Sequence, residues 1–249
     1  AGRLSGEKNL LVIYTAHGFH FYRGAPLWNR VAYYQVEKWL ARYTDALIVI
    51  NQEDEQTARR FHLKPGGRVY RIPGVGLDRE KFRPLAGEER KAARERLGLC
   101  GDGFFRDRIE GWIREKGLED TVTLYGHCPH VPQILGCADA AAFPSIREGL
   151  GMAGLEALAM GIPVLAADNR GTREYMLHGK NGLVCPPGDA EGFARGIETL
   201  RAMDKQERRE MAARCRESTE PFDKRHARTA MQKIYEAADR RVEQKSHGK

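Results

Sequence analysis

Short apolar runs of strand length alternate along this chain with segments whose apolar residues recur every three or four positions. The runs lie at residues 10–15, 46–50, 69–72, 122–125, 138–143, 164–167 and 183–184, and the helical segments at 27–43, 53–61, 88–97, 104–116, 152–159, 172–177, 190–203 and 226–242. This alternation is typical of α/β proteins built on parallel sheets. A chain of 249 residues is long enough for two modest domains, each with its own core.

Charge and hydropathy narrow the classes of partner and location. The net charge of +7 favours anionic partners such as phosphates, nucleotides or an acidic membrane surface. The longest apolar runs, such as 46–50, are far shorter than the roughly 18 residues of a membrane span. No secretory leader opens the sequence, so a cytoplasmic location is expected. A nucleic-acid binder is disfavoured, because the basic residues form neither a stripe nor a known binding module.

The cysteines and aspartates argue against metal sites. The five cysteines contain no Cys-x-x-Cys pair, which makes zinc ribbons and disulfide scaffolds unlikely as classes. Buried free thiols are the expectation. No Asp-x-Asp sequence occurs, and Asp102 is expected to cap a helix rather than to bind a metal. We therefore expect no metal.

Glycine and proline mark one hinge and one irregular junction. Residues 73–76, Pro-Gly-Val-Gly, are typical of a hinge. The expected divisions are residues 1–75, residues 76–220, and a terminal amphipathic helix and tail at 221–249. The helical segment 88–97 runs into the Gly-Asp-Gly sequence 101–103, a strand-to-helix turn, with no strand before it. An internal segment is therefore expected to be missing near 100–101.

The stretch 143–164 contains the most informative loop. A strand ends at Pro144, a glycine-containing loop follows, and a helix begins near Gly151. Free backbone amides at a helix N-terminus are suited to bind phosphate. Glu148 in the loop and Glu156 one turn into the helix could accept hydrogen bonds from sugar hydroxyls. The alternative is that both are ordinary solvated charges.

This stretch resembles the E-x7-E signature of the retaining family-4 glycosyltransferases, here Glu148 to Glu156. The segments 161–164, 171–174 and 181–184 resemble the downstream pattern of that family in the same order. The resemblance implies the GT-B fold, with two Rossmann-like domains on parallel sheets, both incomplete here. It also implies a nucleoside-diphosphate-sugar as donor substrate and no requirement for a metal or another cofactor.

The resemblance further implies which residues bind the nucleotide-sugar: Gly126, His127, Glu148, Gly149, Leu150, Gly151 and Glu156. Glu148 would contact the donor sugar, and Glu156 would bind the nucleotide ribose. The backbone amides of 149–151 would face the diphosphate, and the turn at 126–127 would meet the base.

The N-terminal part, residues 14–27, is similar to a capsular and exopolysaccharide branch of the same family. His17, at the end of the first strand, would face the donor sugar and the acceptor, so His17 and Glu148 are the implied catalytic residues. Open α/β sheets bind ligands at such strand ends, and a structural histidine in a turn is the alternative. His20 is interpreted as structural. The implied acceptor is a glycan or a polyprenyl-linked sugar.

Four aromatic residues, Tyr33, Tyr34, Trp39 and Tyr43, lie at helical spacing within 27–43. Packing in the core is the expectation. Together with the basic residues around them they could instead form a surface for sugar or for anionic lipid. In this family the region often faces the membrane, so the resemblance implies peripheral contact at the inner face of the cell membrane.

Compared with the family, this chain would lack the N-terminal third and an internal segment that carries an arginine and a lysine for the diphosphate. Loss of one charged partner of a desolvated charge costs about 2–5 kcal/mol. The sequence therefore leaves two functions open. One is a retaining transferase in bacterial polysaccharide synthesis, and the other is a catalytically inactive remnant that binds a nucleotide or a partner.

Overall fold

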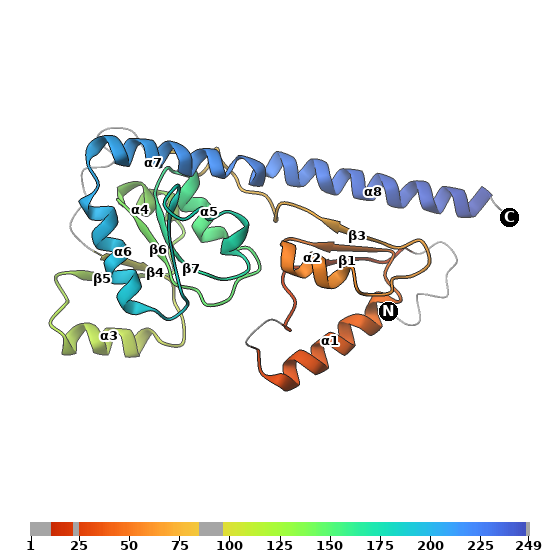
Figure 1. Ribbon diagram of the computed structural model, residues 1–249, viewed down its shortest axis with the longest axis horizontal. Helices are drawn as coiled ribbons and strands as arrows, with labels where there is room; N and C mark the ends of the chain where they lie inside the picture. Colours follow the sequence, from red (N-terminus) through yellow and green to blue (C-terminus); the bar gives the residue numbers. More distant parts are fainter. Residues whose placement is uncertain (1–10, 22–24, 85–96, 248–249) are drawn as a thin grey trace.

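The computed structural model describes residues 11–21, 25–84 and 97–247. In chain order the elements are β1 (Ile13–Ala16), α1 (Leu27–Ala41), β2 (Ala46–Val49), α2 (Gln52–Ala58), β3 (Arg68–Arg71), β4 (Leu97–Cys100), α3 (Arg106–Glu115), β5 (Val122–Gly126), α4 (Val131–Cys137), β6 (Ala141–Phe143), α5 (Met152–Ala159), β7 (Val164–Ala167), η2 (Thr172–Glu174), β8 (Gly182–Cys185), α6 (Ala190–Ala202), α7 (Lys205–Ser218), η3 (Glu220–Phe222) and α8 (Lys224–His247). Figure 1 shows a first unit around β1 to β3, a second unit around the later strands, and α8 running from the second unit along the first. The expected α/β class with parallel sheets is confirmed, because all the described strand pairs are parallel.

The first unit (residues 11–72) is built on the sheet β1–β2–β3. All of β2 is buried, and its side chains point alternately to the two faces of the sheet. Leu47 and Val49 pack with Phe19 and Phe61 on one face, whereas Ile48 belongs to the larger cluster that continues into the second unit. Burial of both faces is the form expected of a parallel strand.

The second unit (residues 97–222) contains two separate sheets, β4–β5 and β6–β7–β8. The strand β7 is wholly buried, and Leu155 and Leu158 of α5 have no exposed surface. In β5, by contrast, only Gly126 is buried. Among the described strands no ladder joins β4 or β5 to β6. This break is consistent with the expected internal gap near 100–101.

The prediction for the junction before residue 101 is wrong in one respect. The segment predicted as helical up to residue 97, with no strand after it, leads into β4, which pairs with β5 so that Leu97 lies opposite Val122. Hydrogen bonding to the edge of a neighbouring strand overrides a weak local helix propensity. The rest of that predicted helix, residues 88–96, lies outside the described residues.

The helix predicted at 172–177 is a single 3-10 turn, η2. The Asn169 side-chain oxygen accepts hydrogen bonds from the amides of Gly171 and Thr172, at 2.9 and 3.0 Å. The Thr172 hydroxyl donates to the Ala167 carbonyl oxygen at 2.7 Å. These side chains satisfy the backbone locally and favour a turn over a longer helix.

Core packing of the α1 aromatic residues was predicted, and it is wrong for three of the four. Tyr34 packs edge-on against Phe61 at a ring distance of 5.4 Å, but Tyr33, Trp39 and Tyr43 are 44%, 55% and 42% exposed. The face of α1 that holds Tyr34 packs against the core of the first unit, which includes Leu47 and Val49 of β2. The other three aromatic side chains lie away from this core. The apolar period of the sequence could not predict which face of the helix would be covered.

Two further predictions about side chains are corrected. Asp102 does not cap α3, which follows Phe105 without a side-chain cap. Its carboxylate instead lies 3.5 Å from the Arg106 guanidinium. All five cysteines are free as expected, but only Cys215 is buried, and Cys100 is exposed.

Two segments join the units near the hinge. The Leu77 amide donates to the Phe222 carbonyl oxygen at 2.8 Å, and the Lys224 amide donates to the Leu77 carbonyl oxygen at 2.9 Å. From there α8 runs back to the first unit, where Arg241 donates to the Asp45 carbonyl oxygen at 3.4 Å. The expected domain boundaries at 75 and 220 stay predictions. None of the described helices is long and apolar enough to span a membrane.

We predict that the amides of β4 and β5 exchange hydrogen for deuterium faster than those of β7. A two-stranded sheet with partly exposed side chains opens more easily than a buried central strand. Mass spectrometry of peptides covering 97–126 and 164–167 measures the difference. A family-type segment inserted between Cys100 and Gly101 should slow the exchange of β4 and β5. Equal protection of both regions in the chain as it stands would contradict this prediction.

Candidate functional site

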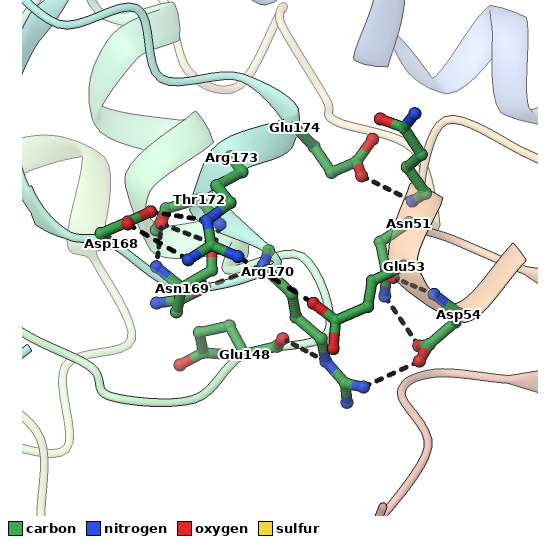
Figure 2. A network of polar contacts seen from close by, with 12 residues as sticks. Asn51, Glu53, Asp54, Glu148, Asp168, Asn169, Arg170, Thr172, Arg173 and Glu174 are labelled. Atoms are coloured by element: carbon green, nitrogen blue, oxygen red, sulfur yellow. Dashed lines mark hydrogen bonds and ion pairs between the residues drawn. The ribbon is translucent and has the colours of Figure 1, made fainter. Parts of the chain in front are cut away.

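The two units meet where the loops after β1 and β2 face the loops after β6 and β7. These are carboxyl ends of parallel strands, at which open α/β sheets bind ligands. The first unit supplies the turn at 17–20 and the start of α2, and the second unit supplies residues 144–151 and 168–174. Figure 2 shows Asp54 of the first unit facing Arg170 of the second.

Two glycines allow the backbones of the units to approach each other closely. A Cβ on Gly149 would overlap the carbonyl oxygen of His17. A Cβ on Gly18, whose φ is +142°, would lie 2.8 Å from the Arg170 guanidinium. Both positions therefore require glycine. His17 follows β1 directly and is exposed, so the structure brings it next to the loop that carries Glu148.

Hydrogen bonds within the second unit hold the Glu148 loop in place. The Ser145 hydroxyl donates to Glu148 Oε1 at 2.7 Å, and the Asn169 amide group donates to the Ser145 carbonyl oxygen at 2.7 Å. The Tyr175 hydroxyl donates to the Gly151 carbonyl oxygen at 3.0 Å. Burial raises the pKa of Tyr175, so the hydroxyl keeps its proton at neutral pH. The loop is fixed by the chain itself.

The start of α5 carries the rest of the predicted donor loop. Gly151, with φ +84°, precedes the first helical residue, and Leu150 is buried. Glu156 lies one turn further on and is partly buried. Burial raises the pKa of Glu156, and the charge of Lys81, from the segment after the hinge, acts in the opposite direction. Glu148 and Glu156 thus lie on one continuous loop and helix.

Gly126 and His127 lie at the end of β5, in the separate two-stranded sheet. Gly126 has φ +62°, and a Cβ there would lie 2.8 Å from the Arg106 guanidinium. The Gly101 amide donates to the Gly126 carbonyl oxygen at 2.7 Å, and His127 is exposed. No strand hydrogen bonds in the described sheets join this turn to the sheet that carries Glu148.

Sequence reasoning missed the polar contacts between the units. Arg170 Nη1 lies 2.7 Å from Asp54 Oδ1, with the two side chains 6% and 3% exposed. The Asn51 amide group donates to the Gly149 carbonyl oxygen at 3.0 Å, and the Gln52 backbone amide donates to a carboxylate oxygen of Glu174 at 2.6 Å. Asn51 lies two residues after the buried strand β2, and that position was the one available sequence signal.

His20, interpreted from the sequence as structural, also contacts the second unit. Its Nδ1 lies 3.1 Å from Arg147 Nη2, and its ring lies 5.1 Å from the Tyr33 ring. Arg147 Nη2 also donates to the Phe19 carbonyl oxygen at 3.4 Å. His20 is exposed and Arg147 is partly buried, and the pair lies at the rim of the site.

A cavity of about 610 Å³ opens beside these contacts, on the hinge side. Its walls include Arg71 at the end of β3, Pro73 after it, Glu174 and Leu177 of the second unit, and Phe222 of η3. Arg71 pairs with Glu174 at 3.3 Å. The cavity is separate from the Glu148 loop.

Comparisons with known proteins are consistent with this geometry. The profile of the family described as glycosyl transferases group 1 matches residues 88–219. The glycosyltransferase EpsD of Bacillus subtilis (strain 168) is 36% identical in an alignment 240 residues long. The match covers 80% of this chain and 63% of EpsD. The lipopolysaccharide core biosynthesis glycosyltransferase LpsE of Rhizobium meliloti is 33% identical over 127 residues, 51% of this chain and 37% of LpsE.

Among solved structures, Anabaena HepE in complex with UDP and glucose superimposes with a TM-score of 0.74 at 22% identity. The match covers 92% of this chain and 71% of HepE. At this level of identity the likeness shows the fold. The chain also spans less than two thirds of the length of EpsD and of LpsE.

We predict that Glu156→Gln melts at a higher temperature than the wild type near pH 7. Burial raises the pKa of Glu156 in the folded chain above its ordinary value of 4.5, which applies to the unfolded chain. At a pH above both the folded and the unfolded pKa, the ionised carboxylate therefore destabilises the fold. Below pH 4.5 the Glu156 carboxyl group is protonated in both the folded and the unfolded chain, so the higher melting temperature of Glu156→Gln disappears. Thermal melts near pH 4 and pH 7 measure it.

Glu191→Gln is the matched control, because the Glu191 side chain is 90% exposed. It should change the melting temperature little at either pH. A gain for Glu156→Gln that is as large near pH 4 as near pH 7 would contradict the assignment of the shift to burial.

Proposed function

The chain belongs to the glycosyl transferases group 1 family, and we propose that it moves a sugar, with retention, from a nucleoside-diphosphate-sugar to a glycan or polyprenyl-linked acceptor in bacterial exopolysaccharide synthesis. The observation that carries the proposal is that Glu148 and Glu156 lie on one loop and helix, and that Gly149 of this loop closely approaches the carbonyl oxygen of His17. The name of LpsE supports a role in polysaccharide synthesis, and the complex of HepE with UDP and glucose supports the donor class.

In this proposal the second unit binds the donor. Glu148 accepts hydrogen bonds from the sugar hydroxyls, and Glu156 accepts them from the ribose. The amides of 149–151, at the start of α5, face the diphosphate, where a helix N-terminus favours negative charge. The turn at 126–127 meets the base. Residues 1–75 then form the acceptor side and residues 76–220 the donor side.

The chemistry would rest on positioning and on charge stabilisation. The bond from the sugar anomeric carbon to the diphosphate breaks, and a bond from the acceptor oxygen forms on the same face. The acceptor proton passes to the leaving diphosphate. His17 contacts the sugar from the first unit, and no metal takes part. The reaction would take place in the cytoplasm, at the inner face of the membrane.

The second candidate is an inactive remnant that binds a nucleotide or a partner. It is favoured by the break between β5 and β6 and by the absence of a matched arginine and lysine for the diphosphate. Arg170, near the loop in sequence, is engaged with Asp54.

We predict that Glu156→Ala weakens binding of the bare nucleoside diphosphate and of the sugar nucleotide by similar factors. Glu148→Ala should weaken binding of the sugar nucleotide alone, because its partner is the sugar. Loss of a charged hydrogen bond of about 1.5–3 kcal/mol corresponds to a roughly 10- to 100-fold loss of affinity. Isothermal titration calorimetry with UDP and UDP-glucose, as the first donor pair, measures both. Equal losses for both ligands in both variants would overturn the assignment.

Turnover distinguishes the two candidate functions. The active enzyme should release sugar from its donor, and His17→Ala should lower this turnover far more than it lowers donor affinity or melting temperature. A chain that binds the nucleotide in calorimetry but never turns over any donor would be the inactive remnant. His20→Ala, at the rim, is the matched control for His17.

For the membrane contact we propose that the outer face of α1 binds an anionic lipid surface. Trp28, Val36 and Trp39 recur along one side of the helix and are 85%, 51% and 55% exposed. Tyr43, 42% exposed, follows the helix and lies 5.3 Å from the Trp39 ring. Exposed tryptophan and tyrosine beside basic residues suit the interface of a membrane, and Arg42 lies next to this face. The net charge of +7 favours anionic over neutral lipid.

We predict that the chain sediments with vesicles that contain phosphatidylglycerol, and that Trp28→Ser combined with Trp39→Ser reduces the bound fraction several-fold. Each exposed tryptophan contributes buried apolar area at the lipid interface. Tyr235→Ser on α8, whose side chain is 50% exposed, is the control. Binding that is the same in the double variant would exclude α1 as the contact.

A further inference from the structure

One guanidinium contacts three segments at the boundary between the units. Arg170 Nη1 donates to Asp54 Oδ1 at 2.7 Å, Nη2 to the Phe19 carbonyl oxygen at 2.9 Å, and Nε to the Glu148 carbonyl oxygen at 3.2 Å. Two of these segments belong to the first unit, and the third is the loop of the predicted donor site. The planar fork of arginine can meet all three at once, and a lysine cannot.

Asp54 contacts the Phe19 segment directly and the Glu148 loop through Asn51. Its Oδ2 accepts hydrogen bonds from the Phe19 amide at 3.3 Å and from the Asn51 side chain at 2.8 Å. The Asn51 side chain in turn donates to the Gly149 carbonyl oxygen at 3.0 Å. Phe19 is therefore held at its amide by Asp54 and at its carbonyl oxygen by Arg170.

The position of the pair is unusual for a contact that only stabilises. Both side chains are almost fully buried, and burial raises the pKa of Asp54 even though Arg170 lowers it. Desolvation of a buried pair often cancels its attraction, so such a pair is weak evidence for stability. The peripheral contact Arg173–Asp168, at 2.7 Å with side chains 58% and 43% exposed, has no such burial.

We propose that Asp54 and Arg170 are positioning residues that set the distance between His17 and Glu148. The inference rests on the proposed function, because it assigns the pair to the site of sugar transfer. Phe19 lies two residues after His17, and Glu148 is itself bonded to Arg170. Both halves of the site are thus fixed to one buried guanidinium, with Gly18 and Gly149 providing the close approach.

If the pair positions the two halves of the site, its loss should affect donor affinity and turnover differently. The proposed donor contacts lie on the second unit, whereas His17 comes from the first. Loosening the pair should therefore leave donor affinity within about threefold, while turnover falls, because a displacement near 1 Å can cost roughly 100-fold in rate. A residue that only stabilises the fold would not separate the two quantities.

The test uses the variants Arg170→Lys and Asp54→Asn, with the double variant Asp54→Asn/Arg170→Gln to avoid a lone buried charge. Donor hydrolysis gives kcat and KM, and calorimetry gives donor affinity. We expect kcat to fall 10- to 100-fold in Arg170→Lys with donor affinity retained. Glu210→Gln, which breaks the exposed Arg214–Glu210 contact on α7 (3.7 Å, side chains 41% and 53% exposed), is the control and should keep kcat. An unchanged kcat in both the single and the double variant overturns the proposal.

Hydrogen exchange supplies a readout that does not need turnover. In Arg170→Lys, exchange should rise in both peptides that cover 17–21 and 145–151, and not in the peptide that covers 164–167. Exchange confined to one of the two loops, or raised throughout the chain, overturns the proposal. If the wild-type chain turns over no donor, the proposed function fails, and the exchange pattern still decides whether the pair fixes both loops. If the single variants do not fold, the double variant gives the same comparison.

Discussion

A parallel strand at the centre of a sheet has to bury both of its faces, and this requirement organises the core of each unit. The strands β2 and β7 are buried along their full length, so that polar residues are left to the loops at the strand ends. Asp54 lies after β2, Glu148 after β6 and Arg170 after β7. The groups capable of chemistry are therefore concentrated at the one edge where the two units face each other.

The same requirement explains which elements could be predicted from the sequence. The predicted residues of α5 and β7 agree with the structure, because a continuous apolar run followed by turn residues leaves one arrangement that buries it. Helix α7 could not be predicted this way, since only Met211 and Cys215 of its residues are buried. The strand β4 exists through its pairing with β5, and such a partner is invisible to a local pattern.

The candidate site also contains residues that could be predicted from the sequence and residues that could not. The loop from Glu148 to Glu156 could be predicted because motif, turn and helix start lie within one continuous segment. Asp54 and Arg170 could not, because 116 residues separate them and each has an ordinary local interpretation, as part of a helix start or of a loop. The exposure of Trp39 was equally hidden, since a helical period reports a face and not what covers it.

The return of α8 to the first unit has a consequence for how the chain folds while it is being synthesised. The Asp45 carboxylate is 2% exposed and lies 3.0 Å from Lys64 Nζ, and Arg241 reaches it at 3.7 Å. Arg241 is 196 residues further along the chain. At roughly 5–20 residues per second of synthesis, the nascent first unit would wait about 10–40 s for this arginine. During that interval its buried aspartate has Lys64 as its cationic neighbour, so the N-terminal unit acquires its final charge balance only when the last helix arrives.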